Sequence, residues 1–340
     1  VVEGGIDALK AVWHRGAVDA DGKTGDGAGI LTEIPNNFFK DEIEKTGHQK
    51  RNEPLGIGMM FLPRNDYSAL EKCRTIIESE LLDHGYYIYG WRQVPINNSV
   101  IGDKANLTRP EIEQVMFVNN IEREKNFDFA KELYLIRRRL EKRIQKQQIS
   151  DFYVCSLSFD SIIYKGLFLA EQLSIFYPDL ANKKFTSSYA LFHQRYSTNT
   201  FPSWGLAQPF RMLAHNGEIN AIRGNRNWVK ARLSKFSTPL IPNITRFKSL
   251  VNETGSDSSA LDNMIELLIK GGINFFRSIR MVLPPAWQNI HTMDPEIRAF
   301  HEYNSMHMEA WDGPAGIVMS DGQWAICVLD RNGLRPARYQ

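Results

Sequence analysis

The sequence predicts a fold of mixed helices and strands, α/β or α+β, and three observations lead to this. The 340 residues, 43% of them hydrophobic, are enough to fill a large core. Short apolar runs bounded by Gly, Pro, Asn or Asp alternate loosely with stretches of helical periodicity. No internal repeat, low-complexity tract or long linker marks a boundary, so we expect a single domain.

The elements are expected in the following order. A first helix is indicated over 1–13, where Ile6, Leu9, Val12 and Trp13 fall on one face at helical spacing. Apolar periodicity predicts further helices at 70–84, 127–148 and 261–270, the last followed by two glycines. Apolar runs predict strands at 30–34, 57–62, 115–118, 152–159, 189–193, 317–319 and 324–329. A turn at 330–333 and the start of another strand at 335–339 complete the pattern.

Both ends of the sequence indicate a piece of a longer chain. No N-cap or turn precedes the first helix, and nothing follows the strand expected at 335–339 for it to pair with. We therefore expect one domain over 1–340 that is truncated at both ends.

Composition argues against several classes of protein. Lys plus Arg number 41 against 39 Asp plus Glu, a net charge of +2, so we expect neither nucleic acid nor a membrane surface as partner. A basic cluster within 137–146 lies opposite the apolar stripe of its helix and is interpreted as a solvated face. No apolar run approaches the roughly 18–20 residues that a membrane span needs.

The cysteines point to a reducing compartment. Cys73, Cys155 and Cys327 are odd in number and far apart, without the C-x-x-C spacing of zinc, iron–sulfur or redox sites. We therefore expect a cytoplasmic protein with no metal site in this chain.

Two motifs resemble known sites but fail the test of context. Gly25, Gly27 and Gly29 have G-x-G-x-G spacing, and no apolar strand leads into them as a dinucleotide fingerprint requires. A tight turn feeding the strand at 30–34 is the simpler interpretation. His301 and Glu302 suggest a metalloprotease helix, but Ser305 stands where the second histidine is needed.

Polar residues are densest over 193–228, and Arg195 is the first functional candidate among them. It follows a predicted buried strand, so a rigid element presents it. The planar guanidinium matches a carboxylate, which makes Arg195 a candidate clamp for a small acid. A surface or capping arginine is the alternative.

Asn216 and Gly217 are the second candidate. Asn-Gly is the commonest pair in a type I′ hairpin turn, and apolar residues precede it. An asparagine amide beside an unobstructed glycine N–H also provides the two neutral donors of an oxyanion hole. Both interpretations are compatible, because a tight turn would fix both donors.

Asp257 is the third candidate, within the polar segment 252–259 that precedes a helix. A plain N-cap is one interpretation. The other is a carboxylate that holds the ammonium group of an amino acid. Arg195 and Asp257 would then hold the two ends of one α-amino acid, with Asn216 and Gly217 left for a carbonyl along its side chain.

Several motifs together resemble the glutamine amidotransferase domain of glutamate synthase large subunits, in the bacterial NADPH-dependent form. They are HRGA at 14–17, TGDGAG at 24–29, the block from HQRYSTNT to NRNW at 193–228, NETGSDS at 252–258, PPAWQ at 284–288 and WDGPAG at 311–316. The likeness runs from end to end of the chain. It implies an α+β fold, a four-layer αββα sandwich of the N-terminal-nucleophile hydrolase type.

The resemblance also implies the reaction and its participants. Members hydrolyse L-glutamine to glutamate and ammonia, which passes to a flavin domain where 2-oxoglutarate becomes a second glutamate. By motif, Arg195 matches the residue that holds the α-carboxylate, Thr198 a nearby substrate contact, and Asp257 the partner of the α-amino group. Asn216 and Gly217 match the oxyanion donors. FMN, an iron–sulfur cluster, NADPH, the remaining domains and a small subunit are expected in the full enzyme rather than in this chain.

The nucleophile of the family has no counterpart in this sequence. The family uses a cysteine at the mature N-terminus, whose α-amino group, with a pKa near about 7.7–8.0 in peptides, serves as base. Position 1 is Val1. Cys155 lies in the middle of a predicted strand and has no free amine, and Cys73 and Cys327 also lack a free amine. We therefore expect the isolated chain to lack glutaminase turnover and to retain a partly formed pocket.

Two alternatives remain open. The first is a non-catalytic remnant that binds an amino acid, and the codons upstream of residue 1 would distinguish it. The second is another class II amidotransferase, feeding purine or amino-sugar synthesis. Such an enzyme is not expected to carry the PSWGLAQPF segment at 202–210 or the PPAWQ motif.

Overall fold

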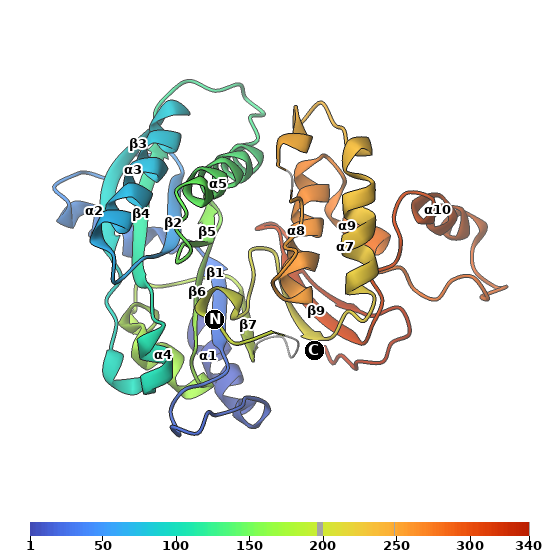
Figure 1. Cartoon of the computed structure of the whole chain (residues 1–340), viewed down its shortest axis with the longest axis horizontal. Coiled ribbons are helices and arrows are strands. Elements are labelled where there is room, and N and C mark those ends of the chain that lie inside the picture. Colours follow the sequence, from blue (N-terminus) through green and yellow to red (C-terminus); the bar gives the residue numbers. More distant parts are fainter. Residues whose placement is uncertain (196–199, 248, 340) are drawn as a thin grey trace. The chain divides into compact units, whose positions relative to one another are not determined.

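The computed structural model describes residues 1–195, 200–247 and 249–339 (Figure 1). The chain divides into two units. The first comprises Val1–Tyr196 and Pro202–Arg211, and the second Ser197–Phe201 and Met212–Gln340. Both contain helices and antiparallel strands, so the α+β class expected from the sequence is confirmed. Within the described ranges, no helix combines the length and apolar content needed to cross a bilayer.

The first unit contains two antiparallel sheets. One has the order β6-β1-β7, and the other the order β3-β4-β2-β5. The strands are β1 Ala28–Glu33, β2 Leu55–Leu62, β3 Tyr86–Gln93, β4 Glu111–Asn119, β5 Tyr153–Ser158, β6 Ser161–Gly166 and β7 Ala190–Gln194. The helices are α1 Val2–Ala11, α2 Asn36–Lys45, α3 Tyr67–Asp83, α4 Asp103–Leu107, α5 Phe129–Lys146 and α6 Leu173–Phe176.

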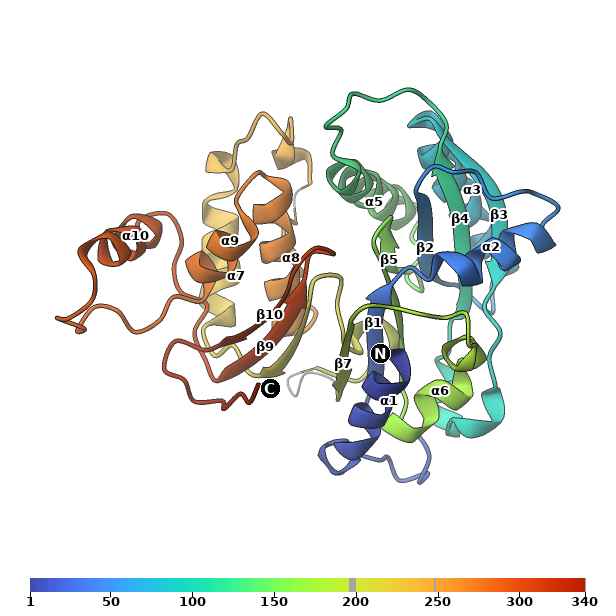
Figure 2. The same ribbon diagram turned by 180° about the vertical axis from the view of Figure 1, so that it is seen from behind.

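Two long helices cover the four-stranded sheet. Helices α3 and α5 contact each other, and they meet the sheet at β3 and β5 (Figure 1). Leu81, Phe117 and Leu140 have no exposed surface in the core between them. On the smaller sheet, α1 lies against β1 and β7 (Figure 2). This contact explains the spacing of Ile6 and Leu9, which are buried.

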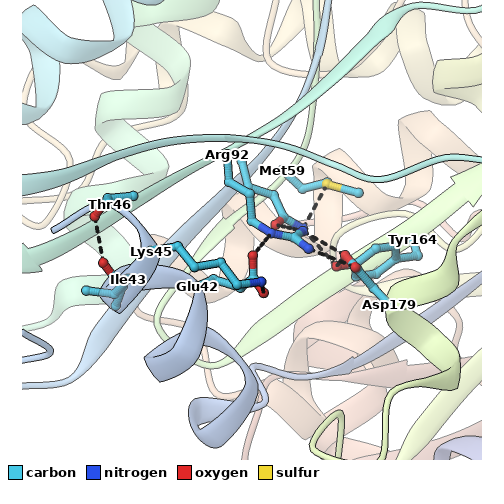
Figure 3. A network of polar contacts seen from close by, with 9 residues as sticks. Glu42, Ile43, Lys45, Thr46, Met59, Arg92, Tyr164 and Asp179 are labelled. Carbon is cyan, nitrogen blue, oxygen red and sulfur yellow. Dashed lines mark hydrogen bonds and ion pairs between the residues drawn. The ribbon is translucent and has the colours of Figure 1, made fainter. Parts of the chain in front are cut away.

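A buried ion-pair network joins these elements within the first unit (Figure 3). Arg92 of β3 donates from Nε to Glu42 at 2.6 Å, and from its two terminal nitrogens to Asp179 at 2.7 and 2.8 Å. The hydroxyl of Tyr164 donates to Asp179 at 2.8 Å. These contacts tie α2, β3 and β6 together, because each buried charge has a partner of opposite sign or a hydrogen bond.

The second unit has one antiparallel sheet of order β10-β9-β8. Its strands are β8 Leu213–Gly217, β9 Ala315–Ser320 and β10 Ala325–Leu329. Its helices are α7 Ile222–Ala231, α8 Asp257–Lys270, α9 Phe275–Val282 and α10 Pro295–Ser305. Helix α8 contacts both β8 and α9, and most of its residues are buried.

Three expectations need correction. The segment 335–339 forms no strand in its described residues, because the Asp330 carboxylate accepts the amides of Asn332, Leu334 and Arg335 and bends the chain. Trp13 is not part of the buried face of the first helix, since it lies in a following 3₁₀ turn and is exposed. The basic face of α5 is not wholly solvated either. Arg137 is buried and donates to Glu141 at 2.8 Å.

Candidate functional site

Arg195 directly follows β7, as the sequence predicts, and its backbone is unusual. Its φ is +106°, a conformation that non-glycine residues rarely adopt. The Arg195 amide donates to the carbonyl of Gly27 at 2.6 Å, where β1 and β7 pair Ala28 with Gln194. The pairing of β7 with β1 therefore fixes where the arginine side chain starts.

The Arg195 side chain lies between a buried carboxylate and solvent. Its Nε is 3.4 Å from Oδ2 of Asp26, which is 6% exposed, while the arginine side chain itself is 49% exposed. Burial raises the pKa of Asp26, and the nearby guanidinium and backbone amides oppose that shift. Thr198, the other substrate contact expected near Arg195, lies outside the described residues.

Asn216 and Gly217 form the end of β8 and not a two-residue hairpin. Asn216 pairs with Gly316 and Gly217 with Ala315, so the partner strand is β9, about a hundred positions further along the chain. Asn216 is exposed. The hairpin interpretation of Asn-Gly is therefore wrong, while the role of Asn216 and Gly217 as oxyanion donors stays a prediction.

A close backbone approach explains why position 217 is glycine. Gly217 has φ +146°, and a Cβ there would lie 1.8 Å from the carbonyl oxygen of Pro314. The neighbouring amide of Glu218 donates to that same oxygen at 2.9 Å. Gly313, on the opposite segment, is also restricted to glycine. Its φ is +151°, and a Cβ there would lie 1.9 Å from the Glu218 carbonyl oxygen. The two segments therefore pack backbone to backbone.

Asp257 is the first residue of α8, and Ser256 is its N-cap, accepting the amide of Ser259 at 3.0 Å. The plain N-cap interpretation of Asp257 is therefore wrong. Its Oδ2 accepts the amide of Ile219 at 2.8 Å, and its exposure is 4%. Asp257 is thus held next to the segment that follows Gly217, so the structure brings Asn216, Gly217 and Asp257 together in the second unit.

Two further polar residues, His215 and Asp262, lie beside Asn216, Gly217 and Asp257. Neither was identified from the sequence. His215 alternates with exposed Asn216 along β8, so it points into the protein, where Nδ1 lies 2.8 Å from the Ser258 hydroxyl. Burial lowers the pKa of His215, so the imidazole is neutral at neutral pH. Asp262 accepts the amide of Met212 at 2.8 Å. Asp257 and Asp262 of α8 thus bind the backbone at both ends of β8.

Comparison with known proteins decides the family. The model of the class-II glutamine amidotransferases matches residues 1–340. The chain belongs to the class-II glutamine amidotransferases. The match spans both units, and the α+β fold is consistent with the N-terminal-nucleophile hydrolase type expected from the sequence.

The amidotransferase is similar over its whole length to glutamate synthases. It is 53% identical to the NADPH glutamate synthase large chain of Azospirillum brasilense and 40% identical to that of Bacillus subtilis, covering 22% of each. Identity to the chloroplastic ferredoxin-dependent glutamate synthase of Spinacia oleracea is 41%, over 21% of that protein. The chain therefore spans about a fifth of the length of the curated relatives it matches.

Two of the three cysteines of this amidotransferase, Cys73 and Cys155, do not resemble an activated nucleophile. Cys73 and Cys155 have no exposed surface, and burial raises the pKa of their thiols to about 11 and about 12. Cys155 lies within β5, as the sequence predicts, and Cys327 is exposed on β10. Both buried thiols therefore stay protonated at neutral pH and act as core side chains.

Proposed function

We propose that this domain binds L-glutamine and hydrolyses it to glutamate and ammonia as the glutaminase part of a glutamate synthase. The observation that carries the proposal is the close packing at the end of β8 in the second unit. There Asn216 and Gly217 provide adjacent donors beside the buried carboxylate of Asp257. The family match and the glutamate synthase relatives support the same reaction.

Each candidate residue has a role in the proposal. Arg195 holds the α-carboxylate through its terminal nitrogens, Asp257 the α-ammonium, and Thr198 contacts the substrate nearby. The Asn216 amide and the Gly217 N–H stabilise the oxyanion. That Arg195 and Asp257 hold opposite ends of one glutamine stays a prediction, since one belongs to each unit.

The reaction needs a nucleophile that the proposal assigns to none of Cys73, Cys155 and Cys327. The α-amino group of a cysteine takes the proton of its thiol, and the thiolate attacks the side-chain carbonyl carbon of glutamine. The C–N bond then breaks as the amide nitrogen of glutamine takes that proton and leaves as ammonia. Water then cleaves the thioester to give glutamate and restores the thiol. The two oxyanion donors act in both steps, because each passes through a tetrahedral intermediate.

Transfer of the ammonia to 2-oxoglutarate is proposed for other parts of the enzyme. An iron–sulfur cluster requires several thiolates at one place, and Cys73, Cys155 and Cys327 do not fit it, because two are in separate core elements and one is in the other unit. We place FMN, the cluster, the NADPH site and a small subunit outside this chain. A cytoplasmic location likewise stays a prediction.

A glutaminase assay tests the proposal. A segment that begins with a cysteine, as the resemblance to the family implies, is joined ahead of residue 1, and ammonia release is measured. Asn216→Ala is expected to lower kcat about 10²–10³-fold with little change in KM, because the lost donor acts on the transition state. Absence of glutamine binding by the parent, or an Asn216→Ala chain of undiminished kcat, would contradict the proposal.

A further inference from the structure

The glycine-rich loop at 24–29 lies beneath Arg195 and has no role in the reaction described so far. Its backbone is tightly held. A Cβ on Gly25 would lie 2.1 Å from the carbonyl carbon of Phe168, and Gly27 has φ +129°. The amide of Asp26 donates to the carbonyl of Ala17 at 3.2 Å. The loop is therefore more than a turn that leads into β1, because it fixes the place of the Asp26 carboxylate.

That carboxylate is buried at a high cost. Asp26 is 6% exposed, and in the part of the chain that the structure describes neither of its carboxylate oxygens has a hydrogen-bond partner of standard geometry, although backbone groups at Ala17 and Asp26 are near enough to lower its pKa. A buried carboxylate without hydrogen bonds destabilises a fold. The cation that faces it is Arg195, with Nε 3.4 Å from Oδ2. The same burial raises the pKa of Asp26, because it disfavours the charged carboxylate.

The same two loop residues hold both the backbone and the side chain of Arg195. Gly27 accepts the Arg195 amide at 2.6 Å, and Asp26 faces the Nε edge of the guanidinium. The Arg195 side chain is 49% exposed, so about half of its surface is open to a ligand. A guanidinium that is fixed along one edge presents its terminal nitrogens as a fork for a carboxylate.

We propose that Asp26 is a positioning residue, which orients the guanidinium of Arg195 for the α-carboxylate of the substrate and so makes the site selective for amides that carry one. The proposal rests on the proposed function, since it assigns glutamine to the site.

Substrate analogues separate positioning from a purely structural role. Glutaric acid monoamide keeps the carboxylate of glutamine and lacks its amine, whereas 4-aminobutanamide keeps the amine and lacks the carboxylate. If Asp26 acts through Arg195, its removal weakens only the ligands with a carboxylate. A general loss of folding would weaken all three ligands alike.

The experiment measures binding of the three ligands to the 340-residue chain by calorimetry, for the parent and for Asp26→Asn, which has nearly the same shape and no charge. We expect the variant to bind glutamine and glutaric acid monoamide about tenfold more weakly, or worse, and 4-aminobutanamide unchanged. In an Arg195→Lys background, Asp26→Asn should have no further effect on glutamine. Asp26→Ser serves as a second variant, with the same expectation, if circular dichroism shows Asp26→Asn to be unfolded.

Asp179→Asn is the matched control, because it also neutralises a buried carboxylate paired with an arginine in the first unit (Figure 3). It is expected to lower stability and leave the ratio of the three affinities unchanged. A parent chain that binds glutamine no better than 4-aminobutanamide would overturn the proposed function. If the parent discriminates, equal weakening of all ligands by Asp26→Asn, or no change, overturns the positioning role alone.

Discussion

At the scale of single residues, Gly217 is the position where a change of one methyl group is expected to cost most. The added Cβ of Gly217→Ala would meet the Pro314 oxygen at 1.8 Å in a backbone conformation that L-residues avoid. Overpacking and backbone strain together predict a loss of roughly 2–4 kcal/mol in the free energy of unfolding. Urea denaturation followed by fluorescence measures it.

Gly224→Ala is the matched control for that experiment. Gly224 lies in α7, and a Cβ there would have open space around it. Alanine in an exposed helix position is expected to raise stability by up to about 1 kcal/mol. Equal effects of the two substitutions would contradict the close approach of the segments around Gly217 and Pro314.

The buried imidazole of His215 predicts a dependence of stability on pH. Burial lowers its pKa in the folded state below the ordinary value of about 6.5, so below that pH the unfolded chain binds a proton that the folded chain does not. The free energy of unfolding should therefore fall between pH 7.5 and 5.5, with a slope from this group of at most about 1.4 kcal/mol per pH unit. Urea unfolding at a series of pH values measures the slope.

His215→Asn keeps a polar group near Ser258 and removes the titration, so its slope should be smaller than that of the parent. The remaining slope should include His301, whose pKa is also lowered by burial. A variant with the same pH dependence as the parent would show that His215 is not the group responsible.

Residue types and spacing could predict Arg195, Asn216 and Gly217 as candidates, and the structure puts Arg195 at a strand end as expected. Asp26 and His215 could not be found in this way. Asp26 faces Arg195 across 169 positions of sequence because β1 pairs with β7, and His215 turns inward because β8 lies against α8. Such contacts depend on pairing between distant segments, which local patterns do not contain.

At the scale of elements, the N-cap of α8 links helix stability to the candidate site. Ser256→Ala removes the acceptor for the Ser259 amide and is expected to lower the free energy of unfolding by about 1 kcal/mol. The loss should be larger if the Ser259 amide remains buried without another acceptor. Because α8 presents Asp257, the same substitution should also weaken glutamine binding. Calorimetry with glutamine, together with urea denaturation, measures both.

Asp66→Ala is the corresponding change at α3, where Asp66 accepts the amide of Ala69 at 2.9 Å in the first unit. A similar loss of stability is expected, without the loss of glutamine affinity. If Ser256→Ala bound glutamine as well as the parent, the N-cap of α8 would not be needed to position Asp257.

Elements with strong periodicity were predictable, and elements defined by their neighbours were not. The helices α3 and α5 and the strand β2 lie within a few residues of the expected ranges, because each has a long or continuous apolar pattern. Strand β3 was missed because it is only partly buried and reads YYIYGWRQ, without clear alternation. The strand expected at 335–339 was wrong because the Asp330 carboxylate takes up the local amides instead.

At the scale of the whole molecule, residues 202–211 complete the first unit after the chain has already contributed to the second. Trp204 is buried against Phe61, Phe168 and Phe176 at ring distances of 5.3–6.0 Å, and its indole N–H donates to Ala105 at 3.1 Å. A chain ending at 196 lacks this side chain. It should therefore unfold at lower urea concentration than one ending at 211.

The difference between these two chains should be at least that caused by Trp204→Ala in the longer one, about 3–5 kcal/mol. Equal midpoints for the chains ending at 196 and 211 would show that the returning segment does not contribute to the core of the first unit.

The order in which the chain visits its two units also restricts how such a protein can evolve. In the described residues, 200–201 belong to the second unit and lie between 1–195 and 202–211 of the first, so neither unit corresponds to one uninterrupted stretch of coding sequence. A recombination breakpoint between 195 and 204 would separate Trp204 from Phe61, Phe168 and Phe176, against which it packs, whereas a breakpoint after 211 would keep these side chains together. Residues 1–211 are therefore expected to be inherited together, because a break between 195 and 204 removes a buried side chain from the first unit.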